Sequence, residues 1–278
     1  MTTNKSSRTL INLIGIPSLL LIIIVGDNYH QLPIFSLFIG VVLFLGIREI
    51  PIFLQNVNAR PFVFILYVFV SLLQINRYPL IAWNLSEIHL LVSLVLVSMI
   101  VEIFRKKETP LINISSVIFV FIWLGVMLGS LAILRNLEIV GFSITLALFL
   151  SVWICDTAAF GFGVKFGKRK ILPSVSPNKT WVGTIAGLLS SIIFMISLYN
   201  YSFFPPIISF IDILVLSLIC GIFGQLGDFV ESLLKREAKI KDSSNFLRGH
   251  GGILDRFDSL SFAAPLTVMY CHYFITIG

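Results

Sequence analysis

Two pairs of acidic residues in the second half of the chain have the spacing of a metal site. Asp228 and Glu231 are three positions apart, and so are Asp255 and Asp258. On a helix, residues at i and i+3 share one face, so each pair predicts two carboxylates that point the same way. Such carboxylates suit Mg²⁺, which takes oxygen ligands from one or two carboxylates and from substrate phosphates. The alternative is ordinary surface ion pairs. The basic neighbours that would form them are Lys235, Arg236 and Arg256.

Neighbouring residues favour the metal and phosphate interpretation. Asp156 and Asp258 lie inside apolar runs, where a charge is costly and usually functional. His250 stands among glycines and is followed directly by Gly251 and Gly252. Glycines let the backbone approach a ligand closely and point its amide groups at an anion. This loop therefore predicts a binding site for an anion.

Segment 161–180 is basic and rich in hydroxyl groups. Its glycines, Gly161, Gly163 and Gly167, do not match the dinucleotide-binding pattern and predict helix packing through small residues instead. Hydroxyl, amide and ammonium groups follow, and at the start of the next apolar run they would suit a phosphate. The residues that carry them are Ser174, Ser176, Asn178, Lys179 and Thr180. The basic residues here are also typical of a cytoplasmic loop.

The elements that must position these residues are membrane helices. Only 12% of the residues are charged and 57% are hydrophobic, whereas soluble domains carry about 25% charged residues. The same composition excludes a disordered chain, and the alternation of a β-barrel is absent from the sequence. The 3 cysteines lie in apolar stretches without C-x-x-C spacing and predict neither disulfides nor a zinc site. We therefore expect an all-α, polytopic integral membrane protein with about nine transmembrane helices.

Nine apolar runs approach the length of about 20 residues that a spanning helix needs. They are about 9–25, 32–47, 61–76, 85–104, 111–134, 141–160, 181–201, 207–227 and 257–276. We expect one integrated membrane domain in two parts. Residues 1–140 would form about five spans, and residues 141–278 would form the catalytic region of about four spans with the cytoplasmic loops 161–180 and 228–256.

The basic residues predict which way the helices face. With nine spans, Arg77 and Arg135 stand on one side and the rest of the 20 lysines and arginines stand on the other. The positive-inside rule places the larger group in the cytoplasm. The N-terminus and the polar loops would then be cytoplasmic, in a membrane of the bacterial inner or plasma membrane type. The net charge of +6 thus reflects topology, and we expect no nucleic-acid partner.

The polar residues form two blocks whose types and spacing carry a resemblance. One block begins at Ser232, continues through Lys241 and ends in the run 250–258, and the other combines Asp156 with the run 174–183. Together they resemble phosphatidate cytidylyltransferases, also called CDP-diacylglycerol synthases. The resemblance implies an all-helical membrane enzyme that converts CTP and phosphatidate to CDP-diacylglycerol and pyrophosphate. It also implies Mg²⁺, an accompanying monovalent cation and a homodimer in the lipid bilayer.

The resemblance assigns roles to individual residues. It implies Asp228 and Asp255 as principal metal ligands, with Glu231 and Asp258 beside them. The cations that would hold phosphates during catalysis are Lys235, Arg236, Lys241 and Arg256. The groups that would bind or support substrate are those of Asp156, Ser174, Ser176, Asn178, Lys179, Thr180, Ser232, Lys241, His250, Gly251 and Gly252. Arg248 departs from the family pattern, which has proline or glycine there, so the local loop geometry is not carried over.

Two other functions remain open. A CTP-dependent membrane lipid kinase of the polyprenol type would need a base for the attacking hydroxyl and would release CDP. A transporter with Asp156 carrying a cation would more often show inverted repeats and broken helices in both halves. Residues 1–140 lack charged partners for such a cation. A product assay separates the first alternative from the cytidylyltransferase reaction.

Overall fold

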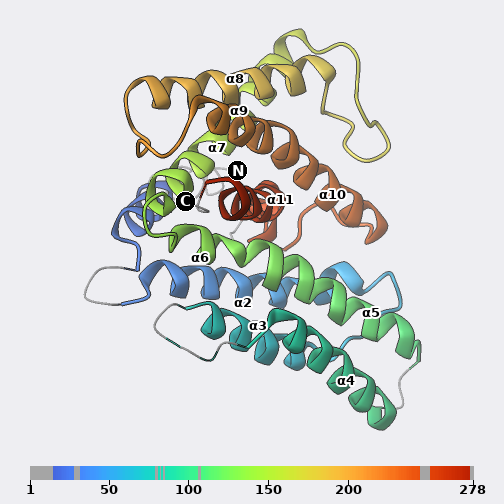
Figure 1. Ribbon diagram of the computed structural model, residues 1–278. Helices are drawn as coiled ribbons and strands as arrows, with labels where there is room; N and C mark the ends of the chain where they lie inside the picture. Colours follow the sequence, from blue (N-terminus) through green and yellow to red (C-terminus); the bar gives the residue numbers. More distant parts are fainter. Residues whose placement is uncertain are drawn as a thin grey trace. The chain divides into compact units, whose positions relative to one another are not determined.

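The computed structural model describes residues 15–27, 32–78, 81, 83, 85–105, 108–244 and 251–275 (Figure 1). These residues form helices and loops, with a single antiparallel bridge between Lys170 and Thr180 and no strand. They fall into two compact units. Unit 1 is Met1–Ile133 with Glu237–Arg256, and unit 2 is Leu134–Arg236 with Phe257–Gly278. The segment that carries the acidic motifs is thus divided between the units.

Unit 1 is built from apolar helices of the N-terminal part of the chain. After the short helix Gly15–Val25, they are α2 (Ile34–Leu54), α3 (Val63–Arg77), α4 (Glu87–Arg105), α5 (Pro110–Val120), the π-helical segment Phe121–Leu128 and the start of α6 (Ser130–Arg135). Asp27 fixes the beginning of α2, because its Oδ1 accepts the N–H groups of Phe35 at 2.6 Å and Ser36 at 3.0 Å. Gly46 then lets Leu254 pack directly against α2, since a Cβ there would lie 2.9 Å from the Leu254 side chain.

Unit 2 contains the longer helices of the C-terminal part. They are α7 (Gly141–Phe166), α8 (Trp181–Asn200), α9 (Phe210–Leu218), the π-helical segment Ile219–Phe223, α10 (Gly224–Glu237) up to Arg236, and α11 (Leu254–Tyr270) from Phe257, followed by Cys271–Ile275. Glycines bring α7 and α8 close together: a Cβ on Gly183 would lie 2.5 Å from the Ala159 carbonyl, and one on Gly187 would lie 2.9 Å from the Cys155 carbonyl. The structure places Gly163 at the same contact, as expected for packing through small residues.

The helical class predicted from composition is confirmed. Among the described residues, six helices are long and apolar enough to cross a membrane: Ile34–Leu54, Glu87–Arg105, Pro110–Arg135, Gly141–Phe166, Trp181–Asn200 and Phe210–Glu237. Two shorter apolar helices, Gly15–Val25 and Val63–Arg77, match two more predicted runs. Helix α11 is not among the six, and it carries Asp255, Arg256 and Asp258 in its first turns. Length and composition therefore give six candidate spans among the described residues.

Candidate functional site

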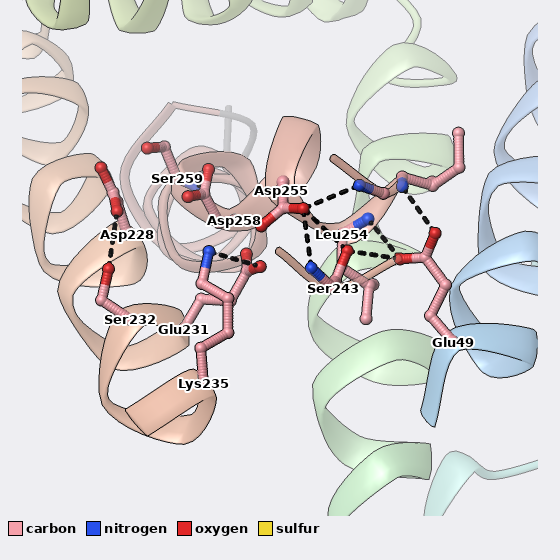
Figure 2. A network of polar contacts seen from close by, with 12 residues as sticks. Glu49, Asp228, Glu231, Ser232, Lys235, Ser243, Leu254, Asp255, Asp258 and Ser259 are labelled. Atoms are coloured by element: carbon pink, nitrogen blue, oxygen red, sulfur yellow. Dashed lines mark hydrogen bonds and ion pairs between the residues drawn. The ribbon is translucent and has the colours of Figure 1, made fainter. Parts of the chain in front are cut away.

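Asp228 is the centre of the polar cluster in unit 2. Its Oδ2 lies 2.5 Å from the Nζ of Lys179. The Ser232 hydroxyl lies 3.3 Å from its Oδ1 (Figure 2). The Lys179 ammonium also stands over the ring of Phe229, 4.2 Å from its centroid, a favourable cation–π geometry. The Lys179 and Asp228 side chains are 26% and 28% exposed. The ion pair is thus well oriented and still reachable by a ligand.

Two more carboxylates surround this ion pair. Asp156 of α7 and Asp258 of α11 both interact electrostatically with Asp228 of α10, and Lys179 acts on Asp156 as well. Like charges that interact in this way destabilise one another unless cations compensate them. Helices α7, α10 and α11 thus each contribute a carboxylate to this cluster, and the loop before α8 contributes the ammonium group of Lys179.

The donor set of this cluster fits a metal that brings other ligands with it. Within the described residues, no three acidic, histidine or cysteine side chains are placed to hold a metal ion by themselves. Mg²⁺ does not need such a cage, because it binds through one or two carboxylates, substrate phosphates and water. Asp228, with a neighbouring carboxylate and partial exposure, meets that requirement.

Glu231 and Lys235 occupy the next turn of α10 and pair with each other. Glu231 is fully buried, and its Oε1 lies 3.2 Å from the Lys235 Nζ (Figure 2). Lys235 in addition interacts electrostatically with Asp258. Arg236 points elsewhere: its Nε donates to the Val175 carbonyl at 3.0 Å, which ties the loop before α8 to α10. Lys235 and Arg236, both predicted to bind phosphates, thus contact other groups of this chain in the structure.

The loop before α8 is an ordered hairpin that presents Lys179. Backbone bonds join Ile171 N–H to the Lys179 carbonyl at 3.2 Å and Trp181 N–H to the Arg169 carbonyl at 3.1 Å. Thr180 caps α8, since its Oγ1 accepts the Gly183 N–H at 3.2 Å, and it is only 2% exposed. The Thr180 hydroxyl thus caps the N-terminus of α8, and this contact holds the preceding residue, Lys179, in place. The other predicted residues of the loop, Ser174, Ser176 and Asn178, lie at the surface or half-buried.

Asp255 belongs to a different cluster, in unit 1. Its Oδ2 accepts three hydrogen bonds: from Ser243 N–H and Ser243 Oγ, both at 2.9 Å, and from Gly252 N–H at 2.7 Å. Gly251 has a positive φ of 76°, and a Cβ on Gly252 would overlap the Ser243 hydroxyl and the Glu49 carboxylate. The close approach that these glycines permit is therefore to carboxylates of the protein itself.

Glu49 of α2 is the residue that the sequence analysis missed. It is 3% exposed and accepts four hydrogen bonds, from the hydroxyls of Ser243 and Ser244 and from the N–H groups of residues 253 and 254. Figure 2 shows its contacts with Ser243 and Leu254. The predicted run 32–47 ends two positions before it, and it is assigned no role in the sequence analysis. The signal was nevertheless present, because a glutamate in an apolar helix meets the criterion that singled out Asp156 and Asp258.

The remaining predicted residues are His250, Lys241 and Arg256, together with Arg248. His250 and Arg248 lie outside the described residues. Lys241 and Arg256 are exposed residues of unit 1. The predicted metal ligands are thus found in two clusters, Asp255 in one and Asp228, Glu231 and Asp258 in the other.

Comparison with known proteins gives one consistent result. Residues 6–274 match the model of the cytidylyltransferase family. The phosphatidate cytidylyltransferase of Bacillus subtilis is 34% identical over 182 residues, which are 66% of this chain and 67% of that protein. The proteins of the same name from Staphylococcus haemolyticus and Staphylococcus saprophyticus are 49% and 48% identical over 118 residues, 42% of this chain and 45% of each relative. These alignments thus span less than half of the staphylococcal proteins. The matches confirm the resemblance that the two polar blocks indicated.

Proposed function

Because the chain belongs to the cytidylyltransferase family, we propose that it catalyses the reaction of CTP with phosphatidate to give CDP-diacylglycerol and pyrophosphate. A phosphate oxygen of phosphatidate attacks the α-phosphorus of CTP, and the bond to the pyrophosphate breaks. The names of the Bacillus and staphylococcal relatives support these substrates. The observation that carries the proposal is the partly exposed Lys179–Asp228 ion pair, with Asp156 and Asp258 around it, in a helical membrane protein.

The geometry suits a reaction whose main requirements are positioning and charge compensation. The phosphate of phosphatidate is already anionic, so the nucleophile needs no serine–histidine or cysteine–histidine pair. Lys179 would exchange the Asp228 carboxylate for a substrate phosphate, which offers the same kind of anionic oxygen. Asp228 and a neighbouring aspartate would hold Mg²⁺, which would neutralise charge on the pyrophosphate. We also propose that Asp255 is a metal ligand.

We further propose nine spans, with the N-terminus and the loops 161–180 and 228–256 in the cytoplasm. The distribution of lysine and arginine supports this topology, since cytoplasmic loops of membrane proteins carry an excess of these residues. Reporter fusions at Asn200 and Gly278 would then read as non-cytoplasmic, and fusions at Lys107 and Lys241 as cytoplasmic. A cytoplasmic reading at Gly278 would overturn the count.

A transfer assay with two labels tests the reaction itself. Purified protein in mixed micelles receives phosphatidate and CTP labelled at either the α- or the γ-phosphate, with and without Mg²⁺. We expect the α-label in the lipid fraction and the γ-label in pyrophosphate, with transfer only when Mg²⁺ is present. In a parallel reaction with polyprenol in place of phosphatidate, the γ-label in lipid together with released CDP would instead identify a lipid kinase. No transfer of the α-label to phosphatidate would overturn the proposal.

A further inference from the structure

Glu49 joins α2 to both ends of the segment that leads into α11. Its Oε1 accepts from the Ser244 hydroxyl at 2.5 Å and from Ile253 N–H at 2.8 Å, and its Oε2 accepts from the Ser243 hydroxyl at 2.8 Å and from Leu254 N–H at 3.1 Å. All five residues belong to unit 1. One carboxylate therefore fixes residues 243–244 and residues 253–254 at the same point.

The two hydrogen bonds from the N–H groups of Ile253 and Leu254 act as a helix cap whose acceptor, Glu49, belongs to a helix distant in sequence. The first N–H groups of a helix have no partner within it, and they attract a negative charge. Usually a serine, threonine or aspartate at the residue before the helix accepts them. Here that residue is Ile253, which has no acceptor in its side chain. Glu49, more than 200 positions away in sequence, takes this role.

The same contacts lead directly to Asp255. The Ser243 hydroxyl lies between the two carboxylates, 2.8 Å from Glu49 Oε2 and 2.9 Å from Asp255 Oδ2 (Figure 2). Because a hydroxyl has one proton, the two carboxylates share it. Gly252 N–H donates to Asp255 at 2.7 Å, while the next two N–H groups, of Ile253 and Leu254, donate to Glu49. Three consecutive amides are thus divided between the two acids.

We propose that Glu49 is a positioning residue that sets the orientation of the Asp255 carboxylate for the cytidylyltransferase reaction. The inference rests on the proposed function, in which Asp255 is a reactive-site carboxylate. Glu49 makes no contact with substrate in this role. It holds the backbone on which Asp255 stands, and the shared hydroxyl of Ser243 transmits any shift of one carboxylate to the other. Groups that orient the ligands of a reactive site typically change activity by roughly 10- to 100-fold when they are replaced.

The Glu49→Gln variant is the sharpest test, because it keeps the size of the side chain. If the amide NH₂ replaces Oε1, it faces the N–H of Ile253, and if it replaces Oε2, it faces the N–H of Leu254. Either way two donors face each other, because a backbone N–H cannot accept a hydrogen bond. The matched control is Glu102→Gln, the same change at another buried glutamate of unit 1. Glu102 is 9% exposed, pairs with Arg105 and accepts from the Asn113 side chain at 3.1 Å. Among the described residues, Glu102 makes no hydrogen bond or ion pair with the segment before α11.

Two measurements separate positioning from simple stability. In the micelle assay we expect Glu49→Gln to lower kcat by roughly 10- to 100-fold with KM for CTP and for phosphatidate within about threefold of wild type, since neither substrate loses a contact. Glu102→Gln should keep kcat within about twofold of wild type. By hydrogen–deuterium exchange, the peptide containing Ile253 and Leu254 should exchange faster in Glu49→Gln and at the wild-type rate in Glu102→Gln.

A double variant tests the transmission through Ser243. If Glu49 acts on Asp255 through the shared hydroxyl, the effects of Glu49→Gln and Ser243→Ala on kcat should be clearly less than additive. An active wild-type protein whose Glu49→Gln variant matches Glu102→Gln in kcat would overturn this inference alone. Additive effects in the double variant would overturn the route through Ser243. A wild-type protein without transferase activity would overturn the proposed function, and the role of Glu49 in that reaction with it.

Discussion

The two carboxylate clusters of this protein are compensated in opposite ways. In unit 1, Glu49 and Asp255 receive hydrogen bonds from backbone amides and serine hydroxyls. In unit 2, Asp228 and Glu231 face the ammonium groups of Lys179 and Lys235. The first cluster uses backbone amides and the short side chains of serines, and the second uses charges at the ends of long, flexible side chains.

This difference predicts a division of labour. A backbone amide that donates to a carboxylate cannot leave without moving its helix, so the unit 1 cluster is suited to holding a fixed geometry. A lysine can transfer its ammonium from a carboxylate to a phosphate by rotating its own side chain, because it is a flexible point charge with three donors. The unit 2 cluster is therefore suited to exchanging partners when a substrate arrives. The variants below test this comparison, from the largest expected effect to the smallest.

The largest effect is expected at the centre of the exchanging cluster. Asp228→Asn removes the charge that orders Lys179 and that would hold the metal, so turnover should fall on the order of 10³-fold. The helix content and the thermal unfolding of the purified protein should change little, because the side chain is partly exposed. Asp242→Asn, on an exposed residue, is the control. Turnover near wild type in Asp228→Asn would remove this residue from the reaction.

Asp255→Asn distinguishes a reactive carboxylate from a mere cap. Asparagine keeps a side-chain oxygen that can accept the N–H groups of Ser243 and Gly252, so a purely structural Asp255 would tolerate the change. If Asp255 also supplies charge to the reaction, we expect turnover to fall by roughly 10²- to 10³-fold while the unfolding temperature in detergent stays close to wild type. Turnover and an unfolding temperature that both stay close to wild type would show that Asp255 has a structural role alone.

Lys179→Met should have the next largest effect, because it removes the cation that is free to exchange. We expect kcat/KM for CTP to fall by about 10²-fold. Lys170→Met provides a matched control in the same loop, since its Nζ donates only to the Asn178 carbonyl at 3.4 Å among the contacts that the structure gives. That variant should stay within about threefold of wild type. Equal losses in the two variants would show that the loop contributes general positive charge and no specific contact.

The smallest effect on the chemistry, and a clear one on stability, is expected for glycine variants. Gly252→Ala would place a methyl group against the Glu49 carboxylate and the Ser243 hydroxyl, and overpacking of this kind costs about 1–3 kcal/mol. Gly161→Ala is the control, because nothing lies within 4 Å of a Cβ there. The temperature of thermal unfolding in detergent should be lower than wild type for Gly252→Ala and unchanged for Gly161→Ala. Equal stability would contradict the tight packing of the unit 1 cluster.

The helices were largely predictable because apolar length and composition are local properties. The run 85–104 corresponds to Glu87–Arg105, and the run 141–160 corresponds to the longer Gly141–Phe166. The end of α7 was missed because it carries Lys165 and two glycines, Gly161 and Gly163, which lower hydropathy without breaking the helix. Similarly, the run 207–227 continues to Glu237, past the acidic residues that marked its predicted end.

The sequence by itself determined the helical membrane class, the two polar blocks and the family, because these depend on composition and on the spacing of nearby residues. Only the tertiary structure decided which partner each carboxylate has. Lys179 and Asp228, or Glu49 and the amides of Ile253 and Leu254, are far apart in the chain and meet through helix packing. A buried carboxylate takes whichever donors the fold brings within hydrogen-bond distance. For that reason the residue types predicted a polar site, while the division into a fixed cluster and an exchanging one became visible only when the helices were packed.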